Sequence, residues 1–163
     1  MKTLLIVYHT RTGGTRQLAE AVLLGGLSEP TIQTHILDAI QAGPEDVLAA
    51  DAWVFAMPEN LAAISGPMKD FFDRCYYPVL DRINGRPYAL VVCAGSDGQN
   101  AVLQVRRIAT GWRLRLVAEP VIVITRAQTP DAILAPTVIG PDDLARCEDL
   151  GAALAAGLAA GIF

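Results

Sequence analysis

The sequence predicts a three-layer α/β domain in which helices cover both faces of a five-stranded parallel sheet with strand order 2-1-3-4-5. Short apolar runs rich in β-branched residues alternate with amphipathic segments along the 163 residues. Hydrophobic residues make up 52% of the chain, which suits a sheet buried on both faces. No repeat, linker or low-complexity segment divides the chain, so we expect a single domain over residues 1–163.

The first strand and the first helix frame the most informative loop of the chain. Residues 4–8 form an apolar run, and from Gly14 onward apolar residues recur at helical spacing, at positions 18, 21, 22 and 25. Residues 9–15 therefore lie between the carboxyl end of a strand and the amino end of a helix. Unpaired backbone N–H groups and the positive end of the helix dipole point outward there, which predicts an anion site.

The composition of this loop narrows the kind of anion. Thr10, Thr12 and Thr15 add hydroxyl donors, and Gly13 and Gly14 allow close backbone approach. Neither G-x-x-x-x-G-K-[ST] nor G-x-G-x-x-G occurs across the loop, which argues against a P-loop and against a dinucleotide fingerprint. We therefore expect a phosphate monoester bound without metal; the alternative is a capped turn with no ligand.

The next elements follow in the same alternation. A second strand is predicted over residues 31–37, a brief helix after Gly43-Pro44, and a third strand over residues 51–57. A second loop over residues 58–65 leads into a helix that starts at Gly66-Pro67. The apolar residues of that helix lie on one stripe, namely Met68, Phe71, Phe72 and Cys75.

The second half of the chain supplies the remaining strands. Residues 87–94 predict a fourth strand, which runs into a third, glycine-rich loop over residues 94–100 and then a helix. Residues 114–125 predict the fifth strand, with a break or an edge position at Glu119-Pro120. Residues 126–140 are predicted to be irregular, and the last helix starts at Gly140-Pro141. In such a sheet the ligand lies beyond the carboxyl ends of the strands, so the three loops should meet.

Two motifs resemble those of a known superfamily. The signature of the flavodoxin superfamily is matched at fixed spacing by Ile6, Val7, Tyr8, Thr10, Gly13, Thr15 and Ala19. Pro58-Glu59-Asn60, followed by Ser65-Gly66 and the helix carrying residues 69–74, resembles the NAD(P)H-dependent FMN reductase and quinone reductase branch. That resemblance implies an FMN cofactor and a flavodoxin-like fold.

The resemblance also implies the residues of the site. The FMN phosphate would be held by Thr10, Arg11, Thr12, Gly13, Gly14 and Thr15. The isoalloxazine would be lined by Pro58, Glu59, Asn60 and Leu61, and its other side closed by Ala94, Gly95, Ser96, Asp97 and Gly98. From the residues alone, Glu59-Asn60 and Asp97-Gly98 could equally be simple turns.

The expected function is an FMN-dependent oxidoreductase that takes a hydride from NAD(P)H and reduces a quinone or a similar small acceptor. No dedicated catalytic residue is expected, because hydride transfer is the chemistry of the cofactor. The alternatives are an electron-carrier flavodoxin and a binding module with weak flavin affinity. A carrier should have a strongly acidic docking face and aromatic flavin walls. The net charge of −4 and the absence of aromatic residues in the second and third loops favour the enzyme.

Charge and cysteine content argue against nucleic-acid binding, a disulfide framework and a metal site. The pI near 5.1 argues against nucleic acid as a partner, and we expect Arg106, Arg107, Arg113 and Arg115 to form a solvated helix face. Three widely spaced cysteines indicate neither a disulfide framework nor a zinc site, and the two histidines are not paired for metal binding. No secretory leader is visible at the start of the sequence, so we expect a cytoplasmic protein.

The last fourteen residues, 150–163, carry no charged side chain. They are too short to span a membrane, which needs about 20 apolar residues. Leu150, Leu154 and Leu158 should form the buried stripe of the last helix. The small residues elsewhere, including Gly157 and Gly161, would let another helix approach closely, so we expect a homo-oligomer.

Overall fold

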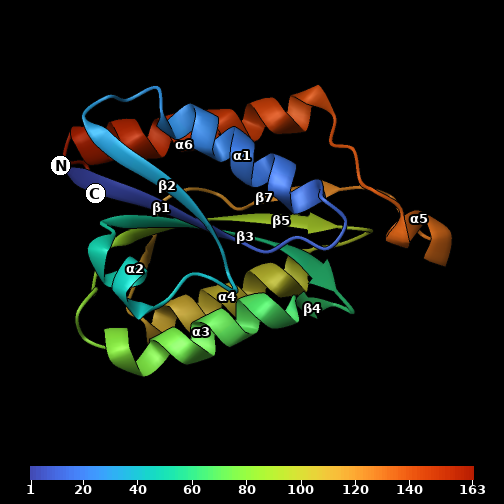
Figure 1. Cartoon of the computed structure of the whole chain (residues 1–163), viewed down its shortest axis with the longest axis horizontal. Coiled ribbons are helices and arrows are strands. Elements are labelled where there is room, and N and C mark those ends of the chain that lie inside the picture. Colours follow the sequence, from blue (N-terminus) through green and yellow to red (C-terminus); the bar gives the residue numbers. More distant parts are fainter.

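A computed structural model describes all residues, 1–163, and has the predicted three layers (Figure 1). Helices α1 (Gly14–Gly26) and α6 (Pro141–Ala159) cover one face of the sheet. Helices α2 (Pro44–Ala49), α3 (Gly66–Val79) and α4 (Gln99–Gly111) cover the other. The helix starts predicted at Gly14, Gly66 and Pro141 are confirmed.

The sheet has the predicted strand order. Strands β1 (Lys2–Tyr8), β2 (Ile32–Asp38), β3 (Ala52–Asn60) and β5 (Pro87–Ala94) are parallel, in the order β2-β1-β3-β5. The fifth position is shared by two short segments, β6 (Arg115–Leu116) and β7 (Val121–Ile124), which both pair with β5. Glu119-Pro120 lies between them, as the predicted break required, because proline cannot donate to the ladder.

Two segments differ from their prediction. The third strand runs past Met57 to Asn60 and folds back as β4 (Ala63–Ile64), so the predicted second loop is largely a β-hairpin. Its two-residue turn places Leu61 and Ala62 at φ 50° and 58°, the left-handed geometry that matches strand twist. Residues 126–140, predicted to be irregular, contain α5 (Pro130–Leu134). The Thr129 hydroxyl caps α5 by accepting from the Ala132 N–H at 3.3 Å.

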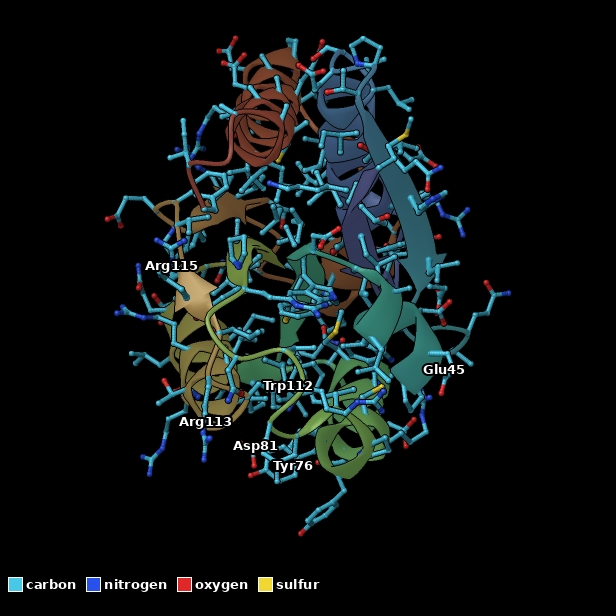
Figure 2. The ribbon with its side chains drawn as sticks, turned by 90° about the vertical axis from the view of Figure 1, so that its left-hand side faces the viewer. Glu45, Tyr76, Asp81, Trp112, Arg113 and Arg115 are labelled. Atoms are coloured by element: carbon cyan, nitrogen blue, oxygen red, sulfur yellow. The ribbon has the colours of Figure 1, made fainter.

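An aromatic cluster fills the core between the sheet and helices α3 and α4. The ring of Phe55 on β3 lies 5.1 Å from that of Phe72 and 6.3 Å from that of Trp112, measured between centroids. Figure 2 shows Trp112 toward the middle of the molecule, where it is buried. The predicted stripe on α3 is buried throughout, because helical spacing brings those side chains to the sheet.

Helices α1 and α6 pack backbone against backbone on the other face. A Cβ added at Gly151 would lie 2.0 Å from the carbonyl oxygen of Val22, and one at Gly25 would lie 1.8 Å from that of Glu148. The predicted leucine stripe of α6 is buried, which confirms that this helix covers the sheet.

The glycine pair that predicted contact with a second chain has other roles. A Cβ at Gly157 would lie 2.1 Å from the ring of Phe163, so this glycine accommodates the end of its own chain. Gly161, at φ 67°, follows the end of α6 in the left-handed conformation that often terminates a helix. Neither glycine therefore supports the expected oligomer.

The arginine prediction is only partly right. Arg106 and Arg107 lie exposed on α4, but Arg113 follows the helix and pairs with Asp81, and Arg115 belongs to β6. Figure 2 shows Arg113 and Arg115 along one outer edge of the molecule. None of the helices combines the length and the apolarity needed to cross a bilayer.

Candidate functional site

The three loops meet around a cavity of about 530 Å³ beyond the carboxyl ends of β1, β3 and β5. Most of the predicted site residues line it: Thr10, Arg11, Thr12, Gly14, Thr15, Pro58, Glu59, Asn60, Leu61, Ala94, Gly95 and Ser96. The structure does not bring Gly13, Asp97 or Gly98 to the cavity wall. The sheet topology explains the convergence, because parallel strands end at the same edge.

The first loop leaves the start of α1 open to the cavity. Gly13 is the N-cap residue at φ 92°, and its N–H donates to the Thr10 hydroxyl at 3.1 Å. No side chain caps α1, and its first turn carries no acidic residue. The Thr12 and Thr15 side chains line the cavity beside this turn. An uncapped helix start flanked by hydroxyls fits the phosphate of FMN.

Thr137, which sequence reasoning missed, holds this loop in place. Its hydroxyl lies 2.7 Å from the Thr12 hydroxyl, and its N–H donates to the Thr12 carbonyl at 2.9 Å. The Gln17 amide donates to the Thr137 carbonyl at 2.7 Å. A Cβ at Gly14 would lie 2.9 Å from Cγ2 of Thr137, so Gly14 makes room for this contact. No local pattern marks Thr137 in the sequence.

Glu59 lines the cavity, but its carboxylate is bound to the third loop. Oε1 accepts from the Gly98 N–H at 2.9 Å, and Oε2 accepts from the Ala101 N–H at 3.0 Å. Glu59 thereby caps α4, whose own N-cap, Gly98, has no side chain to do so. The carboxylate thus joins the hairpin to the start of α4. The other atoms of Glu59 remain available to line the cavity, as predicted.

Two further contacts hold the hairpin to α4. The side-chain amide of Asn100 donates to the Ala62 carbonyl, and the side-chain Oε1 of Gln104 accepts from the Ile64 N–H at 2.9 Å. Asp97 is exposed and directly precedes Gly98, the N-cap residue of α4. A Cβ at Gly98 would lie 2.7 Å from Cγ2 of Ile122, so this position needs glycine at φ 82°.

Several residues of the cavity wall were not predicted. Besides Thr137 they are Ala62, Cys93, Thr125, Ala127, Gln128, Ile133 and Leu134. Burial raises the pKa of the Cys93 thiol to about 11, so at neutral pH it is a protonated, small wall residue. Its burial agrees with the apolar run that contains it, whereas Ile133 and Leu134 come from a segment without periodicity.

His9 lies at the start of the first loop without lining the cavity. Its backbone N–H donates to the Ala56 carbonyl at 3.0 Å. The ring Nδ1 is buried and has no hydrogen-bond partner. Burial lowers the pKa of the imidazole, and the nearby Arg11 guanidinium lowers it further, while the Asp38 carboxylate opposes both. His9 is therefore a neutral, half-buried side chain beside the loop.

Comparison with known proteins agrees with this geometry. A 97-residue stretch is 34% identical to a flavodoxin of Aquifex aeolicus, covering 60% of this chain, and the chain spans about half the length of that curated relative. The structure of a flavodoxin from the domain Archaea superposes with a TM-score of 0.77 at 16% identity, covering 96% of this chain and 99% of that one. The structure of a flavodoxin, WrbA-like protein from Agrobacterium tumefaciens superposes with a TM-score of 0.73 at 19% identity, covering 96% of each chain.

A flavodiiron protein from Giardia intestinalis gives a TM-score of 0.78 at 17% identity, with 98% of this chain covering 37% of that one. Such low identities establish the flavodoxin-like fold alone. The family model described as NADPH-dependent FMN reductase matches residues 17–129, well over half of the chain. The chain therefore belongs to the NADPH-dependent FMN reductase family, whose members are flavin-binding oxidoreductases.

Proposed function

We propose that this chain binds FMN in the cavity and uses it to transfer electrons from NAD(P)H to a quinone or a similar small acceptor. The observation that carries the proposal is the uncapped start of α1, which opens into the cavity beside the Thr12 and Thr15 hydroxyls. An anion there gains from backbone N–H groups and from the helix dipole together. The family membership supports the same cofactor.

Different loops of the chain would bind different parts of the cofactor. The loop over residues 10–15 would hold the phosphate, and Arg11, the one cation of the wall, would add charge. The ring would lie between the hairpin residues 58–61 and the third-loop residues 94–96. Gly13, Asp97 and Gly98 would act by shaping the turns that carry these residues.

Bound FMN supplies two-electron chemistry, so that one hydride from NAD(P)H and one proton from water convert a quinone to its hydroquinone. The protein has to bind and orient the reactants and keep the ring site fixed. Glu59 holds the hairpin in place, because both of its carboxylate oxygens accept hydrogen bonds from the start of α4. No side chain is required to act as a general acid or base.

The phosphate contact is tested with Thr15→Val, which removes a buried hydroxyl without a change of shape. A hydrogen bond to a charged group contributes about 1.5–3 kcal/mol, so the Kd for FMN should rise at least tenfold. Thr110→Val, on the exposed side of α4, is the control. Fluorescence titration measures both, and equal affinity of the unmodified protein for FMN and riboflavin would refute the phosphate site.

An electron carrier is the second candidate, favoured by the flavodoxin of Aquifex aeolicus that matches this chain. Steady-state assays of the FMN-loaded protein separate the two functions. A reductase oxidises NAD(P)H faster when a small quinone is added. A stable one-electron reduced flavin during reductive titration, with negligible NAD(P)H oxidation, would instead identify a carrier.

A further inference from the structure

We infer that α5 is the wall that binds an uncharged, flat acceptor, and that the side chains of Ile133 and Leu134 make the contact. The inference rests on the proposed function and adds to it the element that selects the acceptor. Helix α5 follows the last strand and lies beyond the carboxyl ends of the strands, apart from the body of the sheet (Figure 1).

Ile133 and Leu134 line the cavity yet remain 51% and 63% exposed. No residue of α5 is buried, so this helix contributes nothing to either hydrophobic core. A large apolar side chain that stays exposed on a concave surface is available to a ligand, because covering it releases water. These two side chains are therefore free to contact an apolar ring.

The segment that carries α5 is nevertheless fixed at both ends. Before the helix, the Gln128 amide donates to the Gly95 carbonyl at 3.4 Å, and Thr129 caps the first turn. After the helix, Thr137 bonds to both Thr12 and Gln17. The helix is thus held over the cavity through contacts with the third loop and the first loop.

The hairpin presents a second apolar edge at the same cavity. Leu61 is fully exposed at its tip and also lines the cavity. Figure 1 shows α5 level with the sheet beyond the carboxyl ends of its strands, and the β4 hairpin on the side of the sheet covered by α3 and α4. Leu61 and Ala62 both have positive φ, a strained geometry that the contact from Asn100 helps to hold.

The charges of the wall indicate an uncharged ligand. Arg11 and Glu59 are the only charged residues that line the cavity, and Arg11 belongs to the first loop. Both carboxylate oxygens of Glu59 already accept backbone N–H groups. Asp131, the one charged residue of α5, does not line the cavity. The surface near Ile133 and Leu134 therefore offers apolar contact without an ionic partner.

The family model matches neither α5 nor the first loop, residues 10–15, of this chain. The matched segment ends at residue 129, and α5 begins at Pro130. The elements proposed to hold the ring, residues 58–61 and 94–96, lie inside that segment.

The test uses the full chain loaded with FMN and the double variant Ile133→Ser/Leu134→Ser. Both positions are exposed, so the variant should fold. The control is Val138→Ser, which lies in the same segment and is 87% exposed but does not line the cavity. The probes are 2-methyl-1,4-naphthoquinone, which is flat and uncharged, and ferricyanide, which is a trianion. Naphthoquinone Kd is measured from the perturbation of the flavin absorbance of the oxidised protein.

The double variant should raise the Kd and the KM for the naphthoquinone about tenfold. The Kd for FMN and the KM for ferricyanide should stay within about twofold, and Val138→Ser should resemble the unmodified protein. An unchanged naphthoquinone Kd would overturn the inference, as would a tenfold loss of FMN affinity, which would make α5 a wall for the flavin. If the protein fails to oxidise NAD(P)H, the proposed reductase fails, while the naphthoquinone Kd still decides the role of α5.

Discussion

His9 links a single residue to the pH dependence of stability. Its pKa in the folded chain lies below the ordinary value of 6.5, so the unfolded chain binds the proton more tightly. Its contribution to the free energy of unfolding is therefore complete above about pH 6.5 and is lost as the pH falls through the lowered folded pKa. Asp38 and Arg11 are the charged groups that act on this imidazole.

We expect His9→Gln to flatten the decline in urea stability between about pH 7.5 and pH 5.5. The glutamine carries no titrating group, so the desolvation of a charged ring no longer opposes folding at low pH. Unfolding curves at fixed ionic strength measure the effect. His35→Gln, at an exposed position on β2, is the matched control. A slope that His9→Gln leaves unchanged would assign the decline to other groups.

Individual residues of the site were predictable from the sequence where residue type and position relative to a predicted strand or helix determine the contact. Thr12, Gly14 and Thr15 line the cavity at a strand-to-helix boundary, where backbone N–H groups point toward an anion. Thr137 was not predictable, because its partner Thr12 is 125 residues away in sequence. Such a contact depends on how the chain returns from β7 to α6, and periodicity holds no information about that path.

At the level of elements, the cap on α4 is the contact that joins two loops of the site. Glu59→Gln should lower the free energy of unfolding by roughly 1–2 kcal/mol, because it removes a charge and one of two acceptors at a helix start. The amide protons of Gly98 and Ala101 should exchange faster in the variant. Urea unfolding and hydrogen exchange measure the two effects.

The control is Glu119→Gln, at an exposed carboxylate between β6 and β7. It should leave the free energy of unfolding and the exchange rates of the Gly98 and Ala101 amides unchanged. An unaltered exchange rate at Gly98 in Glu59→Gln would mean that the carboxylate contributes nothing to the helix start. Faster exchange across the whole chain would instead point to a general loss of stability.

Element types were predictable from the change between strand and helix periodicity, whereas two boundaries were not. The uniformly buried run of β3 ends at Met57, and Pro58 and the residues after it are turn formers, so the sequence pattern indicates a loop there. The structure continues the strand because β4 pairs with Glu59 and Asn60. Helix α5 is short and fully exposed, so no apolar stripe marks it in the sequence.

For the whole molecule, we propose a homodimer across the exposed sides of α1 and α6. Leu24 and Leu27 are each 58% exposed on and just after α1, and Ala153 and Ala156 are exposed on α6, which packs against α1. Exposed apolar side chains favour association between protein chains, and the exposed carboxylates of Glu20 and Asp149 lie at the edge of this group. The glycines Gly157 and Gly161 play no part in this proposal.

Light scattering at micromolar concentration should give about twice the chain mass of 17.4 kDa. Ala153→Glu should shift the mass toward that of a monomer, because it places a charge in the contact. Ala49→Glu, exposed at the end of α2, is the control. A monomeric mass that persists on concentration would leave α6 with its role of covering the sheet alone.

The two ends of the chain lie next to each other, at the edge of the molecule opposite α5 and the β4 hairpin (Figure 1). The Lys2 ammonium donates to the Leu158 carbonyl at 2.8 Å and holds the first strand to the last helix there. A tag, a fused module or an immobilising surface attached at either end would therefore extend away from the cavity. A short peptide joining the two ends would likewise allow new termini to be opened elsewhere in the chain.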